Sequence, residues 1–158
     1  YANQVNFEKM IEYFDGFAIN IVRNGIEVID SAKNFHGFSH LSFEEHCRRW
    51  NSTVKSAVFF DTHKNALTIK HSDLVTDTST VFERIYQLAN MEYSELPINY
   101  IKQTVFNSSF SQDKVVTDVE DFFSSRILKI WNSWSDEEKD TFKKICGEMM
   151  VRYDFSYM

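Results

Sequence analysis

The sequence contains little proline and glycine, with one and four residues respectively in a chain of 158. Because these two residues mark turns, their scarcity disfavours a turn-rich β fold and favours long helices. The only two cysteines, Cys47 and Cys146, lack the spacing of a metal site, and both fall on the apolar face of an expected helix. We therefore expect two free, buried thiols and no metal.

Long hydrophobic runs and an excess of positive charge are also absent. No stretch of about 18 consecutive apolar residues occurs, so the sequence predicts no membrane span. The net charge of −6 provides no basic field for nonspecific binding of nucleic acid. No signal peptide is recognisable, and we expect a cytoplasmic protein, with the Golgi lumen as the alternative. The content of 43% hydrophobic and 16% aromatic residues is typical of a globular chain, here a single domain over residues 1–158.

The most informative segment begins with an apolar run at 17–22, which predicts a short buried strand. A turn follows, and then a helix over about 25–34. Asn24 is predicted to cap this helix, and Glu27 to complete a capping box. Arg23 is thereby placed at the carboxyl end of a strand, beside a helix N-terminus. This is the position at which open α/β sheets bind anions.

Arg23 and Ser31 are eight positions apart, so the guanidinium and the hydroxyl can converge on one phosphate. The segment Arg23-Asn24-Gly25-Ile26-Glu27-Val28-Ile29-Asp30-Ser31 resembles the 3′-phosphate-binding segment of sulfotransferases that use PAPS (3′-phosphoadenosine 5′-phosphosulfate). In that family a strand is followed by Arg, an acidic residue or Asn, Pro or Gly, and later Val and Ser. The alternative interpretation is an ordinary βα unit with a surface arginine.

Two further segments extend the resemblance. A helix starts at Ser42 with the capping-box sequence Ser-Phe-Glu-Glu, and it carries the Trp50-Asn51 pair that is frequent in the family. A second apolar strand at 66–70 leads into His71-Ser72-Asp73-Leu74, which is similar to the family's Tyr-Glu-Asp-Leu. The resemblance implies that His71, which replaces the usual tyrosine, lies near the adenine.

The rest of the chain is expected to be helical. Helical spacing of apolar residues predicts helices over 6–14, 78–90 and 96–105, a polar loop over 106–118, and a last helix after the capping box at 135–138. Arg126 precedes Trp131 in a way that resembles divergent sulfotransferases, which implies a contact with the nucleotide. A solvent-facing helical arginine is the alternative.

The resemblance implies a P-loop NTPase-like three-layer α/β fold with a parallel sheet, of which this chain supplies a helix-rich downstream portion. It implies transfer of a sulfuryl group from PAPS to a hydroxyl or amine, leaving adenosine 3′,5′-bisphosphate. Arg23, Ser31, His71 and Arg126 are then the candidates for binding this cofactor.

The family's 5′-phosphosulfate loop is not found in the chain, and no G-x-x-x-x-G-K-[ST] motif occurs. We therefore expect the chain to lack that upstream part of the domain, and no catalytic base is assigned. His36 and His40 follow the phosphate helix and are candidates for lining the acceptor cleft. The acceptor, a small molecule or a glycan, and the oligomeric state have no sequence signal. The alternative function is a non-catalytic interaction module that kept the sulfotransferase fold.

Overall fold

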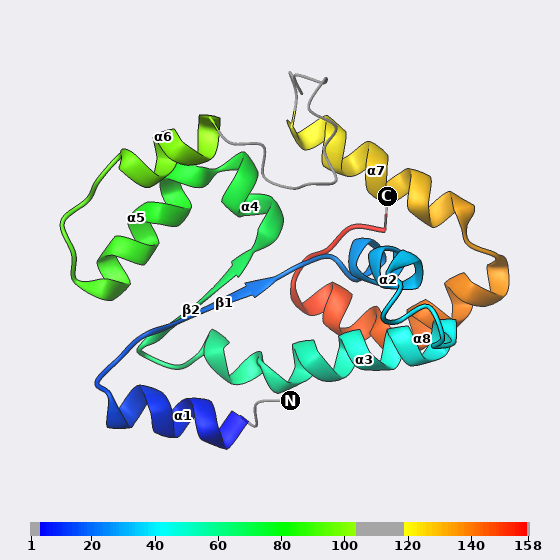
Figure 1. Ribbon diagram of the computed structural model, residues 1–158, viewed down its shortest axis with the longest axis horizontal. Helices are drawn as coiled ribbons and strands as arrows, with labels where there is room; N and C mark the ends of the chain where they lie inside the picture. Colours follow the sequence, from blue (N-terminus) through cyan, green and yellow to red (C-terminus); the bar gives the residue numbers. More distant parts are fainter. Residues whose placement is uncertain (1–3, 104–118, 158) are drawn as a thin grey trace.

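The computed structural model describes residues 4–103 and 119–157, and it shows a helix-rich α/β arrangement with a small parallel sheet (Figure 1). The elements follow the chain as α1 (Gln4–Tyr13), β1 (Ala18–Val22), α2 (Gly25–Asn34), α3 (Phe43–Ser56), the 3₁₀ helix η1 (Val58–Asp61), β2 (Ala66–Lys70), α4 (His71–Thr76), α5 (Thr78–Ala89), α6 (Leu96–Gln103), α7 (Val119–Ser133) and α8 (Asp136–Arg152). The expected mixture of helices and parallel strands is therefore present, and the loop expected over 106–118 lies outside the described residues.

The two strands pair in parallel, in a register that joins Ala18 to Ala66 and Val22 to Lys70. Parallel strands need a long crossover connection, which α2, α3 and η1 supply here. In the described part of the chain these two strands are the whole sheet. The three-layer arrangement expected from the sequence stays a prediction.

The prediction that the first strand is buried is only partly correct. Val22 is 4% exposed, but Ile19 and Ile21, on the opposite face, are 39% and 52% exposed. The apolar run is thus only partly covered, because within residues 4–103 and 119–157 too little packs over Ile19 and Ile21, whereas Ile69 of β2, on the same face of the sheet, is 1% exposed.

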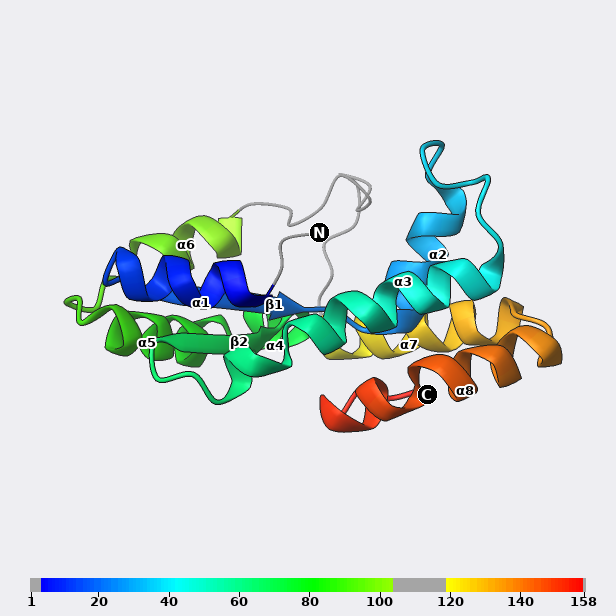
Figure 2. The same ribbon diagram turned by 90° about the horizontal axis from the view of Figure 1, so that it is seen from below.

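The main core lies on one side of the strands, where α2, α3, α7 and α8 gather; α4, α5 and α6 lie on the other side (Figures 1 and 2). The centre of the main core is Phe142 of α8, which is 0% exposed. The Phe142 ring centroid lies 5.3 Å from Trp134, 5.9 Å from Trp131, 6.1 Å from Tyr157 and 6.4 Å from Trp50. Burial of a Phe side chain contributes about 1.5–3 kcal/mol, so this aromatic cluster is a main source of stability.

The helix termini agree with the local sequence in two of three predicted cases. The Ser42 and Ser135 hydroxyls accept hydrogen bonds from the backbone amides of Glu45 and Glu138 at 3.3 and 3.1 Å, and both predicted capping boxes are confirmed. The segment 71–76, which includes the His71-Ser72-Asp73-Leu74 sequence, is the short helix α4, which begins directly after β2. An acidic residue in its first turn suits a helix N-terminus.

The expectation for the cysteines is also confirmed. Cys47 and Cys146 are both buried and free, and the Cys146 thiol donates a weak hydrogen bond to the Cys47 carbonyl oxygen at 3.6 Å. This hydrogen bond and, to a smaller extent, burial raise the pKa of Cys146 above its ordinary value. Across the described residues, no helix combines the length and the apolar character that crossing a bilayer requires.

Candidate functional site

The carboxyl ends of the two strands bring Arg23 and His71 together. Because Val22 pairs with Lys70, the next residue of each strand leaves the sheet at the same edge. Arg23 leads into α2, and His71 is the first residue of α4. Two of the residues predicted from the sequence therefore emerge side by side, where parallel sheets bind ligands.

Both polar atoms of the Asn24 side-chain amide form hydrogen bonds at the start of α2. Its Oδ1 accepts a hydrogen bond from the Ile26 amide at 2.9 Å, which confirms that it caps the helix. Its Nδ2 donates to the carbonyl oxygen of Ser156 at 3.0 Å and so attaches the C-terminal segment to the site. The predicted capping box with Glu27 is wrong, because the Glu27 carboxylate binds a side chain instead.

That side chain is Arg23. Its Nε and Nη2 donate to Oε2 and Oε1 of Glu27, both at 3.2 Å, in a two-pronged ion pair. The Glu27 side chain is 3% exposed, whereas that of Arg23 is 25% exposed. A buried carboxylate needs a cation and hydrogen-bond donors to remain charged. Glu27 thus holds the arginine in place and cancels part of its charge.

Arg126 of α7 approaches the same carboxylate, with its Nε 3.8 Å from Oε1 of Glu27. Arg126 was expected at the ligand of Arg23 on resemblance alone, and the structure brings the two arginines to one carboxylate. Glu27 was not recognised as part of this group. The available signal was the spacing of four residues between Arg23 and Glu27, which is the spacing of ion pairs on a helix.

His71 completes the cluster. Burial lowers its pKa, and the charges of Arg23 and Arg126 lower it further, while Glu27 opposes them. His71 is therefore close enough to all three groups to be influenced by them, and it is held in the neutral form near pH 7. A neutral imidazole can stack on a base or hydrogen-bond to it.

A cavity of about 270 Å³ opens at this cluster. Helices α4 and α7 and the C-terminal segment form its walls, and the lining residues are Arg23, Asn24, Glu27, Ser72, Thr76, Ser124, Ile127, Asp154, Phe155 and Ser156. Typical ligand pockets are about 300–1,000 Å³. The cavity therefore fits a part of a nucleotide, such as a phosphate with its sugar, better than a whole one.

The remaining predicted residues do not join this cavity. Ser31 is exposed on α2, one turn beyond Glu27, and it is not among the lining residues. His36 and His40 are exposed in the connection between α2 and α3, and they do not line it either. The shared phosphate of Arg23 and Ser31 and the acceptor-side role of the two histidines stay predictions.

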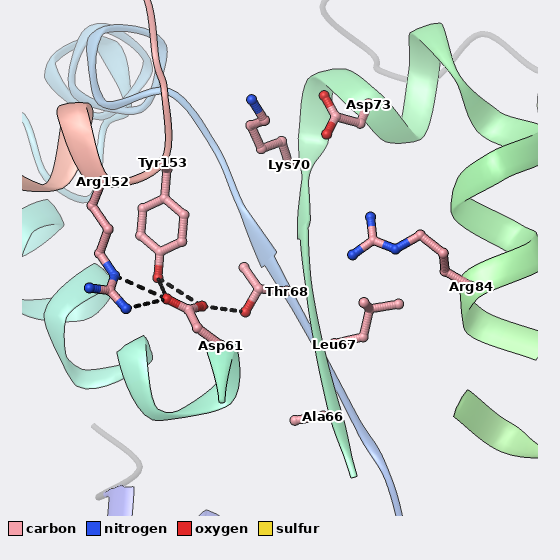
Figure 3. Close-up of a pocket in the computed structure, with 9 residues that line it drawn as sticks. All are labelled: Asp61, Ala66, Leu67, Thr68, Lys70, Asp73, Arg84, Arg152 and Tyr153. Atoms are coloured by element: carbon pink, nitrogen blue, oxygen red, sulfur yellow. Dashed lines mark hydrogen bonds and ion pairs between the residues drawn. The ribbon is translucent and has the colours of Figure 1, made fainter. Parts of the chain in front are cut away.

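A second cleft, of about 550 Å³, borders the other side of the same C-terminal segment (Figure 3). Its floor is occupied by Asp61, which accepts hydrogen bonds from Thr68 at 2.7 Å, Arg152 at 2.8 Å and the Tyr153 hydroxyl at 3.2 Å. Burial and the Asp61 charge raise the pKa of Tyr153. These groups satisfy one another, so they anchor the end of α8 to β2.

Two cations that line the second cleft, Arg84 and Lys70, lie apart from the hydrogen bonds around Asp61. Figure 3 shows the Arg84 guanidinium directed into the opening. Lys70 faces it from the end of β2, with its Nζ 3.8 Å from the exposed carboxylate of Asp154. Asp154 lines the first cavity and Lys70 lines the second cleft, so their ion pair lies between the two openings. No feature of the sequence analysis predicted this second cleft.

Within the described ranges, no three His, Cys, Asp or Glu side chains are grouped as a metal site would need. Searches with protein-family models, curated proteins and solved structures as references found no match to this chain.

Proposed function

We propose that this chain forms the 3′-phosphate site of a sulfotransferase that uses PAPS. The observation that carries the proposal is the meeting of Arg23, Arg126 and His71 at the carboxyl ends of adjacent parallel strands, beside the N-terminus of α2. Helix N-termini and arginines both favour phosphate. In this proposal β1 and β2 belong to the parallel sheet of a three-layer, P-loop NTPase-like fold.

The Arg23–Glu27 pair leaves donors for a phosphate. Arginine has five N–H groups, of which Nε and one N–H of Nη2 bind Glu27. Three N–H groups of Arg23 therefore remain, and its partial exposure makes them accessible. Arg126 adds a second cation, and Ser31 adds a hydroxyl from the open face of α2. His71 would contact the adenine.

The reaction is transfer of the sulfuryl group of PAPS to a hydroxyl or an amine, with adenosine 3′,5′-bisphosphate as the leaving product. The residues of this chain serve to hold and orient the nucleotide, which lowers the barrier by positioning. The acceptor is a small molecule or a glycan, and His36 and His40 are the candidates for its side of the cleft. The free thiols of Cys47 and Cys146 fit a reducing compartment such as the cytoplasm.

A non-catalytic interaction module is the second candidate. It is favoured by Glu27, which already occupies two donors of Arg23, and by the exposed apolar face of β1 at Ile19 and Ile21. An arginine whose charge is neutralised by a carboxylate stabilises the fold. A phosphate site, in contrast, needs cations that are available to the ligand. Nucleotide binding distinguishes the two candidates.

The test measures the shift in melting temperature on addition of adenosine 3′,5′-bisphosphate, with adenosine 5′-monophosphate as the comparison ligand. Ligand at a hundredfold excess over Kd stabilises the native state by about 2.7 kcal/mol, which raises Tm by about 5–10 °C. Ser31→Ala is the informative variant, because Ser31 is exposed and its loss leaves the fold intact. We expect a smaller shift in that variant and an unchanged shift in Ser52→Ala, an exposed serine of α3.

A shift that is equal for both nucleotides, or that Ser31→Ala leaves unchanged, would contradict the 3′-phosphate site. No shift at millimolar ligand with a folded chain would favour the interaction module.

A further inference from the structure

The end of α5 and the connection to α6 form a further cleft, of about 560 Å³. This cleft shares no lining residue with the two openings at the strand ends, and α5 and α6 lie across the sheet from the main core (Figures 1 and 2). Its lining residues are Glu83, Tyr86, Gln87, Asn90, Met91 and Tyr93. Ligand pockets measure about 300–1,000 Å³, so the cleft is large enough for a small molecule.

Two tyrosine rings form a corner in this lining. The ring centroids of Tyr86 and Tyr93 are 5.7 Å apart, and the ring planes make an angle of 67°. In such an edge-to-face pair the angle between the rings exposes a face of each ring, and the faces carry the negative part of the ring quadrupole. Tyr93 is 48% exposed, and Met91, with its polarisable thioether, is 61% exposed. The corner is therefore accessible from solvent and suited to a cation.

The charges around the corner are negative. The C-terminus of α5, which ends here, is the negative end of the helix dipole, and its last turn contains no basic residue. Glu83 lines the cleft, and Glu92 and Glu95 follow in the connection to α6. None of these three carboxylates forms an ion pair with a described residue. Partial burial raises the pKa of Tyr93, and the charges of Glu95 and Glu83 raise it further. The neighbouring Arg84 is directed into the other cleft (Figure 3), so it does not occupy the corner.

We propose that this cleft binds a quaternary ammonium group, held in the angle between the rings of Tyr86 and Tyr93 and beside the carboxylate of Glu83. The methyl groups of such a cation pack on the rings, and the cation has no N–H group that needs an acceptor. A primary ammonium is more strongly hydrated and gains less from this lining. A phosphate close to the ammonium would be repelled by Glu83 and Glu95, so the ligand is a head group without an adjacent phosphate.

The test compares choline with 3,3-dimethylbutan-1-ol, which has the same shape but a neutral carbon in place of the nitrogen. Binding is followed by the methyl NMR signal of Met91, a residue of the lining. Choline chloride replaces sodium chloride in the titration, so the ionic strength stays constant. Cation–π contact at exposed sites strengthens binding about two- to fivefold per ring. We therefore expect choline to bind about tenfold more tightly than the alcohol, a ratio that needs no variant.

Variants assign this preference to the ring corner. Tyr93→Leu removes one ring and should reduce the preference to about threefold, whereas Tyr93→Phe keeps the ring and should keep the preference. Glu83→Gln should weaken choline binding about twofold and leave the alcohol unchanged. Tyr13→Leu, which replaces an exposed tyrosine of α1 outside the cleft, should change neither ligand.

Two further ligands define what carries the head group. Phosphocholine should bind more weakly than choline, because its phosphate meets the carboxylates. A peptide with trimethyllysine carries the same cation: tighter binding than choline identifies a protein as its source, and equal or weaker binding identifies a small molecule.

The proposal is overturned if choline does not shift the Met91 signal at tens of millimolar, if choline and the alcohol bind equally, if Tyr93→Leu keeps the full preference, or if Tyr93→Phe loses it. None of these results depends on the nucleotide site, so the two proposals stand or fall separately.

Discussion

Replacement of Arg23 by alanine tests the buried carboxylate at the centre of the site. Glu27 is 3% exposed, so the variant leaves its charge in the protein interior without its two-pronged partner. Breaking a buried pair by removing one partner costs about 3–5 kcal/mol. The Nε of Arg126, 3.8 Å from the carboxylate, compensates for part of the loss. We therefore expect the lower end, about 3 kcal/mol, or a fall in Tm of about 6–12 °C.

Glu27→Gln should be much less harmful, although it breaks the same pair. Glutamine keeps the shape and one acceptor oxygen, and the Arg23 that remains is 25% exposed and can reach water. We expect a loss of about 1 kcal/mol. The double variant Arg23→Gln with Glu27→Gln removes both charges and should be more stable than Arg23→Ala, because no charge is left buried without a partner.

Arg48→Ala is the matched control. Arg48 and Glu44 form an ion pair with the same four-residue spacing on α3, but their side chains are 67% and 53% exposed. Such surface pairs contribute about 0–1 kcal/mol. Urea unfolding followed by far-UV circular dichroism measures all four variants. If Arg23→Ala and Glu27→Gln differed by less than about 0.5 kcal/mol, or if Arg23→Ala matched Arg48→Ala, the buried carboxylate would not depend on Arg23 as described.

Three other predictions concern the fold. Ile69→Ala, at a site 1% exposed, should lower the free energy of unfolding by about 2–5 kcal/mol. Its register partner Ile21, whose side chain lies on the same face of the sheet, is 52% exposed, so Ile21→Ala should cost less than about 1 kcal/mol; equal losses in urea melts would argue against the burial of this face at β2 and its exposure at β1. Cys146 should not react with a thiol reagent in the native chain and should react fully in denaturant, because it is buried and its pKa is raised; fast labelling without denaturant would contradict its burial. Burial lowers the pKa of His46 and His71, so the unfolded chain binds more protons below about pH 6.5. The free energy of unfolding should be at its full value above that pH and should fall on acidification. The fall should be smaller in His46→Leu. Parallel curves of Tm against pH for the wild type and for His46→Leu would refute this.

The local features of the fold were predictable because they depend on neighbouring residues. A Ser followed three positions later by Glu defines a capping box without help from the rest of the chain, and Ser42 and Ser135 behave accordingly. The closeness of Arg23 and His71 was also predictable in kind, because each follows an apolar strand and parallel strands end at one edge.

The features that depend on distant contacts were not predictable. Glu27 had two local options, the backbone N–H of Asn24 and the side chain of Arg23, and its burial beside Arg126 of α7 favours the ion pair. The exposure of Ile19 and Ile21 depends on what covers the sheet, which an apolar run does not reveal. The free Nε2 of His46 is a property of tertiary packing alone.

The most direct test of the 3′-phosphate site compares two isomers by isothermal titration calorimetry: adenosine 3′,5′-bisphosphate and adenosine 2′,5′-bisphosphate. Both carry the same charge, so nonspecific attraction to Arg23 and Arg126 contributes equally to each. A site built for the 3′-phosphate predicts at least tenfold tighter binding of the 3′,5′ isomer, or about 1.4 kcal/mol, and a smaller ratio in Ser31→Ala. Equal affinities, or no heat with either isomer, would contradict the proposal that this chain binds the nucleotide of a sulfotransferase.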